Sequence, residues 1–412
     1  MMVEEDAEVE AIDSRLAEPP TALQVALLTA GYDKPYVMGL TEALAGEDVG
    51  MEVVGGDSID NPVLRANRKV RFLNLIGSRE GASLPAKMGR VLAYYARLIR
   101  YAATARPRLF HILWNNKFER FDRTCLMAYY KVLGKKVVLT AHNVNAGKRD
   151  GNDSLMNRLT LRTQYRLADH IFVHTEKMKS ELEEQFGVRG ESVSVIPFGI
   201  NRSVPDTELT PEEARRRLGI GEGEKAILFF GALRPYKGLE YLVDAFLQLA
   251  EIHPEYRLIL AGERRRESGD YPSEVLRRID TSVHRSRVLQ AIRFIADEEA
   301  EVYFKATDLL ALPYTHVFQS GVLFTGYGFG LPVVATDVGS IREEVIEGET
   351  GFLCQARDAA SLGRAVEAYF ASDLYRFLSR RRPEIQAWAE ARHSWSTVGA
   401  ITRRVYADLL AG

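Results

Sequence analysis

Short apolar segments alternate with amphipathic helical patterns along this chain, and the alternation runs through it twice. The strands expected in the first half are 23–30, 50–57, 108–114, 135–142, 170–175 and 192–200. Those expected in the second half are 226–232, 256–262, 291–296, 308–314 and 331–337. Strands separated by helices pair in parallel and are covered by helices on both faces. The predicted fold class is therefore α/β, with two Rossmann-like doubly wound domains that face a central cleft.

A proline-containing break between the two halves predicts the domain boundary. The linker is expected near 197–210, and Thr210 followed by Pro211 is a typical helix start. The acidic first twenty residues have no apolar core, so we expect a disordered tail and no signal peptide. The predicted parts are a tail at 1–20, an N-terminal acceptor domain at 21–198, a C-terminal donor domain at 199–390, and a C-terminal helix at 391–412 that packs back on the N-terminal domain.

Composition narrows the functional classes. The formal net charge is −2, which gives the whole chain no bulk affinity for nucleic acid. Its two cysteines, Cys125 and Cys354, are far apart and are expected to be buried thiols in a reducing compartment. No apolar run approaches the roughly 18 residues that a spanning helix needs. A cytoplasmic protein is expected, at most peripheral at the inner face of the plasma membrane.

One segment departs from this neutral balance. Residues 61–118 contain twelve lysines and arginines, and the only acid among them is Glu80. Within it, 85–103 has a helical pattern. Its expected apolar stripe is Met88, Val91, Leu92, Tyr95, Leu98, Ile99 and Ala102. The expected opposite face is Lys87, Arg90, Tyr94, Arg97 and Tyr101. Either the helix packs on the core with a solvated basic back, or the basic region 65–108 docks on an anionic membrane.

The segment FFGALRPYKGLEYLVDAF at 229–246 predicts an anion site. A strand ends at Gly231, where the backbone can approach a ligand closely, and a helix begins after Gly238. Arg234 can bind two phosphate oxygens, and Lys237 can reach a third. These residues predict a diphosphate site, and a solvated basic turn is the alternative.

Two further turns carry candidate site residues. Ser320 can start a helix that presents the backbone N–H groups of Gly321 and Val322, although the glycines of this loop could serve only tight packing. His142 and Asn143 lie just past an expected strand end, where a lone histidine is more often structural. Three other residues complete the set: Gly31 as a third turn, and His111 and His174 as core histidines.

Several chemistries have no motif in the sequence. It contains no D-x-D, HExxH, GxSxG or GxxxxGK[ST] pattern. Without D-x-D, arginine, lysine and helix dipoles must neutralise the diphosphate. We therefore expect no metal and no cofactor.

These segments together resemble retaining glycosyltransferase family 4, which has the GT-B fold. The resemblance covers nearly the whole chain from about Leu23 and is strongest in 229–246, 257–262, 295–314 and 330–353. It implies that Lys237 binds the diphosphate of a nucleotide-sugar donor together with Arg234, since Ala232 stands where the family often has its arginine. It also implies that His142 borders the donor sugar and takes part in catalysis.

The chain departs from the family at one motif. The family usually carries two glutamates eight positions apart, and these places hold Val317 and Thr325 in a variant loop with the sequence QSGV. The remaining donor-site expectations are the diphosphate at Gly231 and Gly31, the nucleobase at Phe294 and Ile295, and the sugar and ribose at Asn143, Gln319, Ser320, Gly321, Val322 and Thr325.

The resemblance implies a metal-independent, retaining hexosyltransferase of polysaccharide biosynthesis. Its co-substrate would be a sugar nucleotide of the UDP or GDP type, and its acceptor a glycan or a lipid-linked glycan. Because both glutamates are absent, a catalytically inactive GT-B scaffold subunit is the alternative. An epimerase or phosphorylase is the weaker third reading, since neither an acid–base set nor a cofactor lysine is evident.

Overall fold

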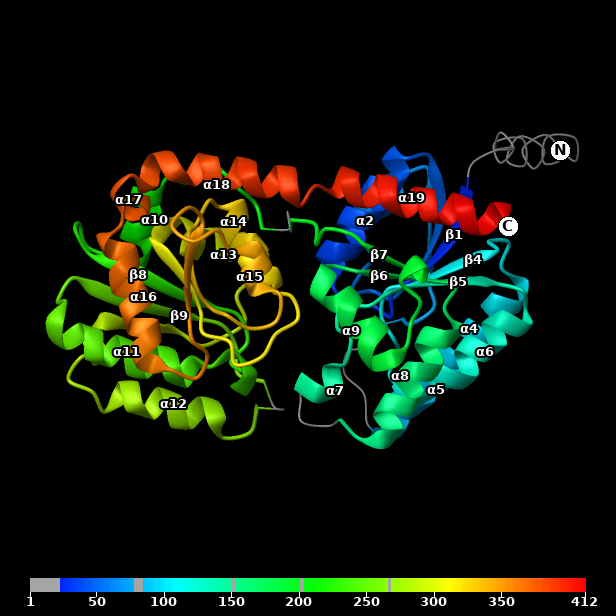
Figure 1. Cartoon of the computed structure of the whole chain (residues 1–412), viewed down its shortest axis with the longest axis horizontal. Coiled ribbons are helices and arrows are strands. Elements are labelled where there is room, and N and C mark those ends of the chain that lie inside the picture. The colour runs from blue at the N-terminus through cyan, green and yellow to red at the C-terminus, as the bar shows by residue number, and fades with distance from the viewer. Residues whose placement is uncertain (1–22, 78–83, 150–152, 201–203, 266–267) are drawn as a thin grey trace, which may run out of the picture.

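The computed structural model describes residues 23–77, 84–149, 153–200, 204–265 and 268–412. Two parallel sheets, each flanked by helices, form two halves of the molecule (Figure 1). The predicted α/β class with two Rossmann-like domains is confirmed. The acidic tail expected at 1–20 lies outside the described residues.

The N-terminal sheet has the strand order β3-β2-β1-β4-β5-β6-β7. Its strands are β1 (Leu23–Leu28), β2 (Val49–Gly55), β3 (Val70–Asn74), β4 (Leu109–Ile112), β5 (Lys136–Thr140), β6 (His170–Val173) and β7 (Val193–Val195). The helices are α2 (Lys34–Gly46), α3 (Pro62–Ala66), α4 (Leu84–Thr104), α5 (Glu119–Phe121), α6 (Met127–Val132), α7 (Ala146–Arg149), α8 (Leu155–Leu167) and α9 (Glu176–Phe186). One π-helical turn, Asp122–Leu126, joins α5 to α6.

The C-terminal sheet has the order β10-β9-β8-β11-β12-β13. Its strands are β8 (Lys225–Phe230), β9 (Tyr256–Ala261), β10 (Val288–Ala291), β11 (Leu309–Leu312), β12 (Val333–Thr336) and β13 (Gly351–Cys354). The helices are α10 (Pro211–Leu218), α11 (Leu239–Ile252), α12 (Tyr271–Asp280), α13 (Asp297–Ala306), α14 (Gly321–Gly328), α15 (Ile341–Glu344), α16 (Ala359–Ala371), α17 (Asp373–Arg376), α18 (Leu378–Arg392) and α19 (Trp395–Ala411).

Three strand predictions need correction. The strand expected at 291–296 is β10, which ends at Ala291, so 292–296 form a loop. Two edge strands, β3 and β13, were not expected at all. Both are short and only partly buried, and β3 also contains Arg71 and Asn74, so neither has the long apolar run that was used to recognise strands. The core histidines are as predicted, since His111 and His174 are buried, but Cys125 is exposed and only Cys354 is buried.

Helix α4 forms where predicted, but its buried face is rotated from the expected one. Tyr94 is only 7% exposed, and its hydroxyl group donates to Asn116 Oδ1 at 2.5 Å. Tyr101 is half-buried and donates to Glu52 at 2.7 Å. Met88, Leu92 and Ile99, expected in the core, are exposed instead. The tyrosine rings can replace the aliphatic side chains in the core because their hydroxyl groups form hydrogen bonds there, to Asn116 and Glu52.

The last two helices connect the domains. Helix α18 lies over the C-terminal domain, and α19 continues from it across the N-terminal domain (Figure 1). Trp395, at the start of α19, packs so tightly against Gly39 and Gly199 that a Cβ atom at either glycine would collide with its ring. Its Nε1 donates to the carbonyl oxygen of Ile200 at 2.9 Å. Further along α19, Tyr406 contacts His111 Nδ1 at 2.5 Å.

Candidate active site

The carboxyl ends of both sheets hold the loops that the sequence marked. In parallel α/β sheets, ligands bind beyond these ends. The N-terminal domain places Gly31, Trp114, His142 and His174 after β1, β4, β5 and β6, and the C-terminal domain places Gly231 after β8 and Ser320 after β11.

Contacts between the domains hold the two sets of loops together. Thr175 and Ser340 form a buried hydroxyl pair at 2.8 Å. Lys177 Nζ donates to the carbonyl oxygen of Gly339 at 2.8 Å. Phe318, from the loop after β11, packs into a hydrophobic cluster of the N-terminal domain. The two carboxyl edges therefore meet across one shared cleft.

Lys237 and Gly231 lie side by side at the C-terminal side of this cleft. Gly231 has a φ angle of 101°, and a Cβ atom there would lie 2.5 Å from Lys237 Nζ. Burial, and secondarily the charge of Arg234, lower the pKa of Lys237 to about 8. Among the described residues its Nζ has one weak acceptor, the carbonyl oxygen of Phe230 at 3.4 Å. A buried amine with so few partners is suited to an anionic ligand.

The start of α14 faces the same place. Ser320 caps the helix by accepting from the backbone N–H of Leu323, and its hydroxyl lies 3.1 Å from the Tyr314 hydroxyl. Val322 is the other neighbour of a Cβ atom built on Gly231, at 3.7 Å. The unbonded N–H groups of the first helical turn therefore open near Lys237, as an anion site requires.

Val317 and Thr325 stand where the family usually carries its two glutamates, so neither position supplies a carboxylate. Val317 is buried, and its carbonyl oxygen lies against Gly339. Thr325 is also buried, and its hydroxyl donates to the carbonyl oxygen of Gly321 at 3.0 Å.

A carboxylate nevertheless reaches this loop from another element. Gln319 Nε2 donates to Oε1 of Glu344, the last residue of α15, at 3.2 Å. Glu344 is only 4% exposed, and its Oε2 lies 3.1 Å from Nε2 of the buried His393, next to Trp395. Despite burial, the contacts with His393 and Gln319 keep the pKa of Glu344 below its usual range. Sequence reasoning missed Glu344, because its spacing matches no motif.

Four other predicted site residues, Gly31, Arg234, Phe294 and Ile295, lie in three different loops. Arg234 is half-buried just before the 3₁₀ turn Pro235–Lys237. In the loop after β10, Phe294 is 68% exposed and Ile295 only 8%. Gly31 has a φ angle of 71° and belongs to the N-terminal domain, where it accepts from Ser58 at 2.9 Å. Its neighbour Tyr32 lines the cavity beside His142.

His142 has one fixed tautomer, which follows from its neighbours. His174 Nδ1 must donate to the carbonyl oxygen of Ile196, at 3.3 Å, so His174 Nε2 is an acceptor. His142 Nδ1 lies 3.0 Å from that nitrogen and therefore donates to it. This leaves His142 Nε2 as an acceptor, and it has no partner among the described residues. Burial, with a smaller effect of His174, lowers the pKa of His142 well below its usual value, so the ring stays neutral.

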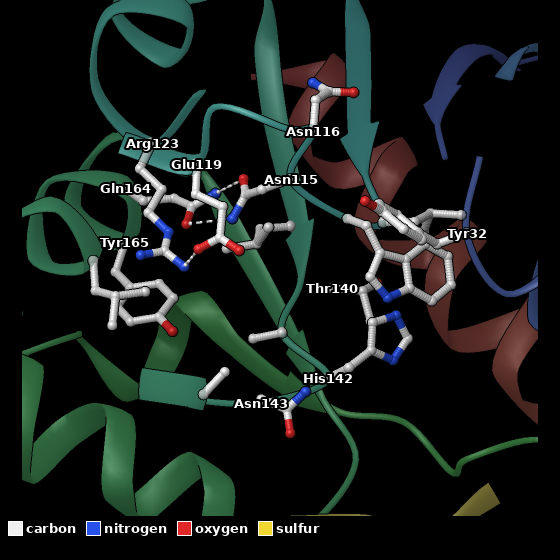
Figure 2. Close-up of a pocket in the computed structure, with 16 residues that line it drawn as sticks. Tyr32, Asn115, Asn116, Glu119, Arg123, Thr140, His142, Asn143, Gln164 and Tyr165 are labelled. Carbon is white, nitrogen blue, oxygen red and sulfur yellow. Dashed lines mark hydrogen bonds and ion pairs between the residues drawn. The ribbon is translucent and has the colours of Figure 1, made fainter. Parts of the chain in front are cut away.

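A cavity of about 320 Å³ opens beside His142 in the N-terminal domain. Trp114 stacks on the His142 ring, with the two ring centroids 4.4 Å apart, and forms one wall. On the opposite wall, Arg123 and Glu119 are joined by an ion pair, and Asn115 and Gln164 exchange two hydrogen bonds, as Figure 2 shows. An aromatic wall with amide and balanced charged groups is chemically suited to sugar hydroxyls.

The π-helical turn Asp122–Leu126 places Arg123 in this cavity. Such turns occur frequently at functional sites. Arg123 is only 8% exposed, and its Nε has no partner among the described residues. Next to it, burial raises the pKa of Asp122 to about 6, although hydrogen bonds from Tyr95 and Asn116 act against this. Sequence reasoning missed Trp114, Glu119 and Arg123, whose only signal was that β4 ends shortly before Trp114.

Comparison with known proteins assigns the family. Residues 35–204 match the family "Glycosyltransferase Family 4", and residues 224–372 match "Glycosyl transferases group 1". The chain belongs to glycosyltransferase family 4. It is thus a glycosyltransferase, and the expected family is confirmed.

Relatives and solved structures agree with this assignment. A D-inositol 3-phosphate glycosyltransferase of Corynebacterium diphtheriae is 25% identical over 92% of this chain and 90% of that protein. A glycogen synthase of Mycobacterium tuberculosis is 29% identical over 66% of this chain and 62% of that protein. Sucrose-phosphate synthase of Thermosynechococcus elongatus has a similar structure, with a TM-score of 0.74 at 21% identity over 94% of this chain and 99% of that one. The Anabaena protein HepE, in complex with UDP and glucose, has a TM-score of 0.71 at 19% identity over 94% of this chain and 100% of that one. The expected GT-B fold is thereby confirmed.

Two features are absent from the described part of the chain. They contain no group of three or more His, Cys, Asp or Glu side chains that could hold a metal ion. No described helix is both long and apolar enough to cross a membrane.

Proposed function

We propose that this family 4 enzyme transfers a hexosyl group, with retention of anomeric configuration, from a nucleoside diphosphate sugar to a glycan or lipid-linked acceptor. The observation that supports the donor most is the pairing of buried Lys237 with the start of α14 across Gly231. These groups can neutralise a departing diphosphate without a metal ion. Arg234 would add a second cationic contact.

The proposed reaction proceeds on one face of the sugar. The acceptor oxygen forms a bond to the anomeric carbon while the bond from that carbon to the diphosphate oxygen breaks. The acceptor proton passes to the departing phosphate oxygen, which balances the charge. The protein would then mainly position both substrates and stabilise the diphosphate. His142 Nε2, a neutral acceptor, would take a hydrogen bond from a hydroxyl group of the transferred sugar.

For the donor, UDP-glucose is the first compound to test. Solved structures of HepE contain UDP, UDP and glucose, or UDP-glucose. Phe294 and Ile295 would border the nucleobase, and Thr325 with the N–H groups of the QSGV loop would contact ribose and sugar. A GDP-sugar is the alternative donor, and a thermal-shift screen of both nucleotide classes would separate them.

Donor hydrolysis in EDTA tests the function directly. We expect release of UDP or GDP from the matching sugar nucleotide at an unchanged rate in chelator, because Lys237 and α14 would do the work of a metal. Proton NMR of the first transferred product should show the anomeric configuration of the donor. Complete loss of turnover in EDTA, restored by Mg²⁺ or Mn²⁺, would refute metal independence.

A catalytically inactive binding subunit is the second candidate. It is favoured by Val317 and Thr325 at the places of both family glutamates. Against it stands the carboxylate of Glu344, which contacts Gln319 in the same loop. Failure of every sugar nucleotide to be hydrolysed or transferred, with nucleotide binding intact, would support the inactive subunit.

We further propose peripheral docking on an anionic membrane from the cytoplasmic side. Met88, Leu92 and Ile99 expose their side chains on α4, and Arg97 and Arg100 are exposed on the same helix. Phe118 and Phe121, whose rings pack on Tyr95 of α4, are also more than one third exposed. Apolar side chains beside basic ones suit the boundary of a lipid surface, where each basic residue contributes about 1 kcal/mol.

Vesicle sedimentation tests this docking. The protein should sediment with phosphatidylserine vesicles at low salt, be released at high salt, and stay in solution with phosphatidylcholine vesicles. The Arg97→Glu/Arg100→Glu variant should lose sedimentation and retain nucleotide binding. Arg364→Glu/Arg376→Glu, which makes the same charge change on the C-terminal domain, should behave as wild type. Equal sedimentation with both lipids, or with neither, would favour a soluble acceptor.

A further inference from the structure

A second cavity, of about 260 Å³, adjoins the one beside His142. The two cavities share Tyr32 and Asn116 in their walls. The lining of the second cavity is Ala30, Tyr32, Ile76, Lys87, Arg90, Val91, Tyr94, Asn116 and Lys117. A ligand could therefore extend from one cavity into the other around these two shared residues.

The charges of the two cavities differ. The cavity beside His142 contains the ion pair of Arg123 with Glu119, so its charge is balanced. The second cavity is lined by three basic side chains, Lys87, Arg90 and Lys117, and by no carboxylate. Lys87 and Lys117 form no ion pair among the described residues. Uncompensated positive charge in a cavity favours an anionic ligand.

The two segments that carry these basic residues are held together by hydrogen bonds. Lys87 and Arg90 stand three residues apart on α4, and therefore on one side of that helix. Tyr94 donates to Asn116 Oδ1 at 2.5 Å, and Tyr95 donates to Asp122 at 3.0 Å, which ties α4 to the loop that carries Lys117. The cavity is therefore a built feature of the packing between α4 and this loop.

We propose that this second cavity binds a phosphate or diphosphate group of the acceptor, whose reacting sugar lies in the cavity beside His142. The inference rests on the proposed function and adds the acceptor class. The acceptor would be a phosphorylated saccharide or polyol and not a neutral glucan. The amide, indole and paired charged groups would bind its hydroxyls, and Lys87, Arg90 and Lys117 its phosphate. Free and lipid-borne sugar phosphates share this chemistry.

Binding of glucose 1-phosphate in the presence of saturating UDP tests the site without any turnover. UDP occupies the donor site, so heat released on titration reports a second anion site. We expect wild type to bind glucose 1-phosphate and not glucose. The Lys87→Gln/Lys117→Gln variant should bind it at least about tenfold more weakly, with UDP affinity unchanged. Arg106→Gln/Arg108→Gln, which removes two charges from the same basic segment away from the cavity, is the matched control.

A second experiment, with lipid vesicles, distinguishes a free sugar phosphate from a lipid-borne one. Phosphatidylcholine vesicles containing phosphatidylinositol are offered in high salt, where general attraction to anionic lipid is screened. Loss of sedimentation in Lys87→Gln/Lys117→Gln alone would place the phosphate of a lipid in the cavity. Binding of glucose 1-phosphate without vesicle binding would indicate a soluble acceptor. If neither probe binds, or if both bind the variant as well as wild type, the proposal is wrong. If UDP itself does not bind, the proposed function fails instead.

Discussion

A Lys237→Met variant should bind UDP at least about ten times more weakly than wild type, and its turnover should fall by a similar or larger factor. A hydrogen bond to a charged group contributes about 1.5–3 kcal/mol, and Lys237 is buried beside Gly231 with only one weak protein acceptor. Methionine keeps most of the side-chain volume, so packing against Tyr314 should persist. Isothermal titration calorimetry with UDP measures the loss. Lys225→Met, at the amino end of the same strand β8, is the matched control.

The pH dependence of UDP binding gives a second readout of Lys237. Its pKa of about 8 lies below that of a free lysine, because burial disfavours the charged amine. A bound diphosphate favours the charged form, so binding above pH 8 requires proton uptake. We therefore expect UDP affinity to decrease above about pH 8, where the Lys237 amine loses its proton. The Lys237→Met variant should lack this decrease. An affinity that ignores pH up to 9.5 in wild type would remove Lys237 from the diphosphate site.

Replacing His142 with alanine should lower kcat about a hundredfold and leave UDP affinity unchanged. One hydrogen bond that strengthens as charge develops on the sugar contributes on the order of 2–3 kcal/mol to the transition state. Nothing in the diphosphate site touches His142, which belongs to the other domain. His142→Gln should recover part of kcat, since its Oε1 can accept the same hydrogen bond. Initial rates with saturating donor measure the effect.

The protonation state of His142 gives a further test of its role. The depressed pKa of His142 keeps its ring neutral, so the rate should show no inflection from this group between pH 5 and 8. His253→Ala, on the surface of the C-terminal domain, controls for the loss of a histidine. If His142→Gln is as inactive as His142→Ala, while both fold, the side chain acts by shape and its Nε2 does not accept from the substrate.

The proximity of Gly231 and Lys237 could be predicted from local sequence, whereas their role in donor binding stays a prediction. Gly231 and Lys237 lie within seven residues, and a strand, a glycine with positive φ and a helix start each leave a local pattern. The cavity beside His142 left little signal in the sequence. Trp114, which follows β4, and Arg123, in the π-helical turn, line the same cavity, and no spacing in the sequence predicts that turn.

The face of α4 was misjudged for a related reason. Hydrophobic periodicity treats tyrosine as ambiguous, and two positions of the helix could bury either a tyrosine or an aliphatic side chain. Asn116 and Glu52, which are distant from α4 in sequence, accept hydrogen bonds from the hydroxyl groups of Tyr94 and Tyr101. These bonds favour burial of the two tyrosines. Glu344 could not be predicted for the same reason. The residues that contact its buried carboxylate, Gln319 and His393, are distant from it in sequence.

Trp395 has a consequence for how the two halves of the molecule can move. The chain crosses between the domains near Ile200 and again at His393, and both crossings are bonded to each other, since Ile200 N donates to the His393 carbonyl oxygen and Trp395 Nε1 donates to that of Ile200. The two crossings are therefore tied at one point. An opening of the domains about this point would break the more distant contacts of Thr175 and Lys177, and we expect substrates to enter from the side opposite it.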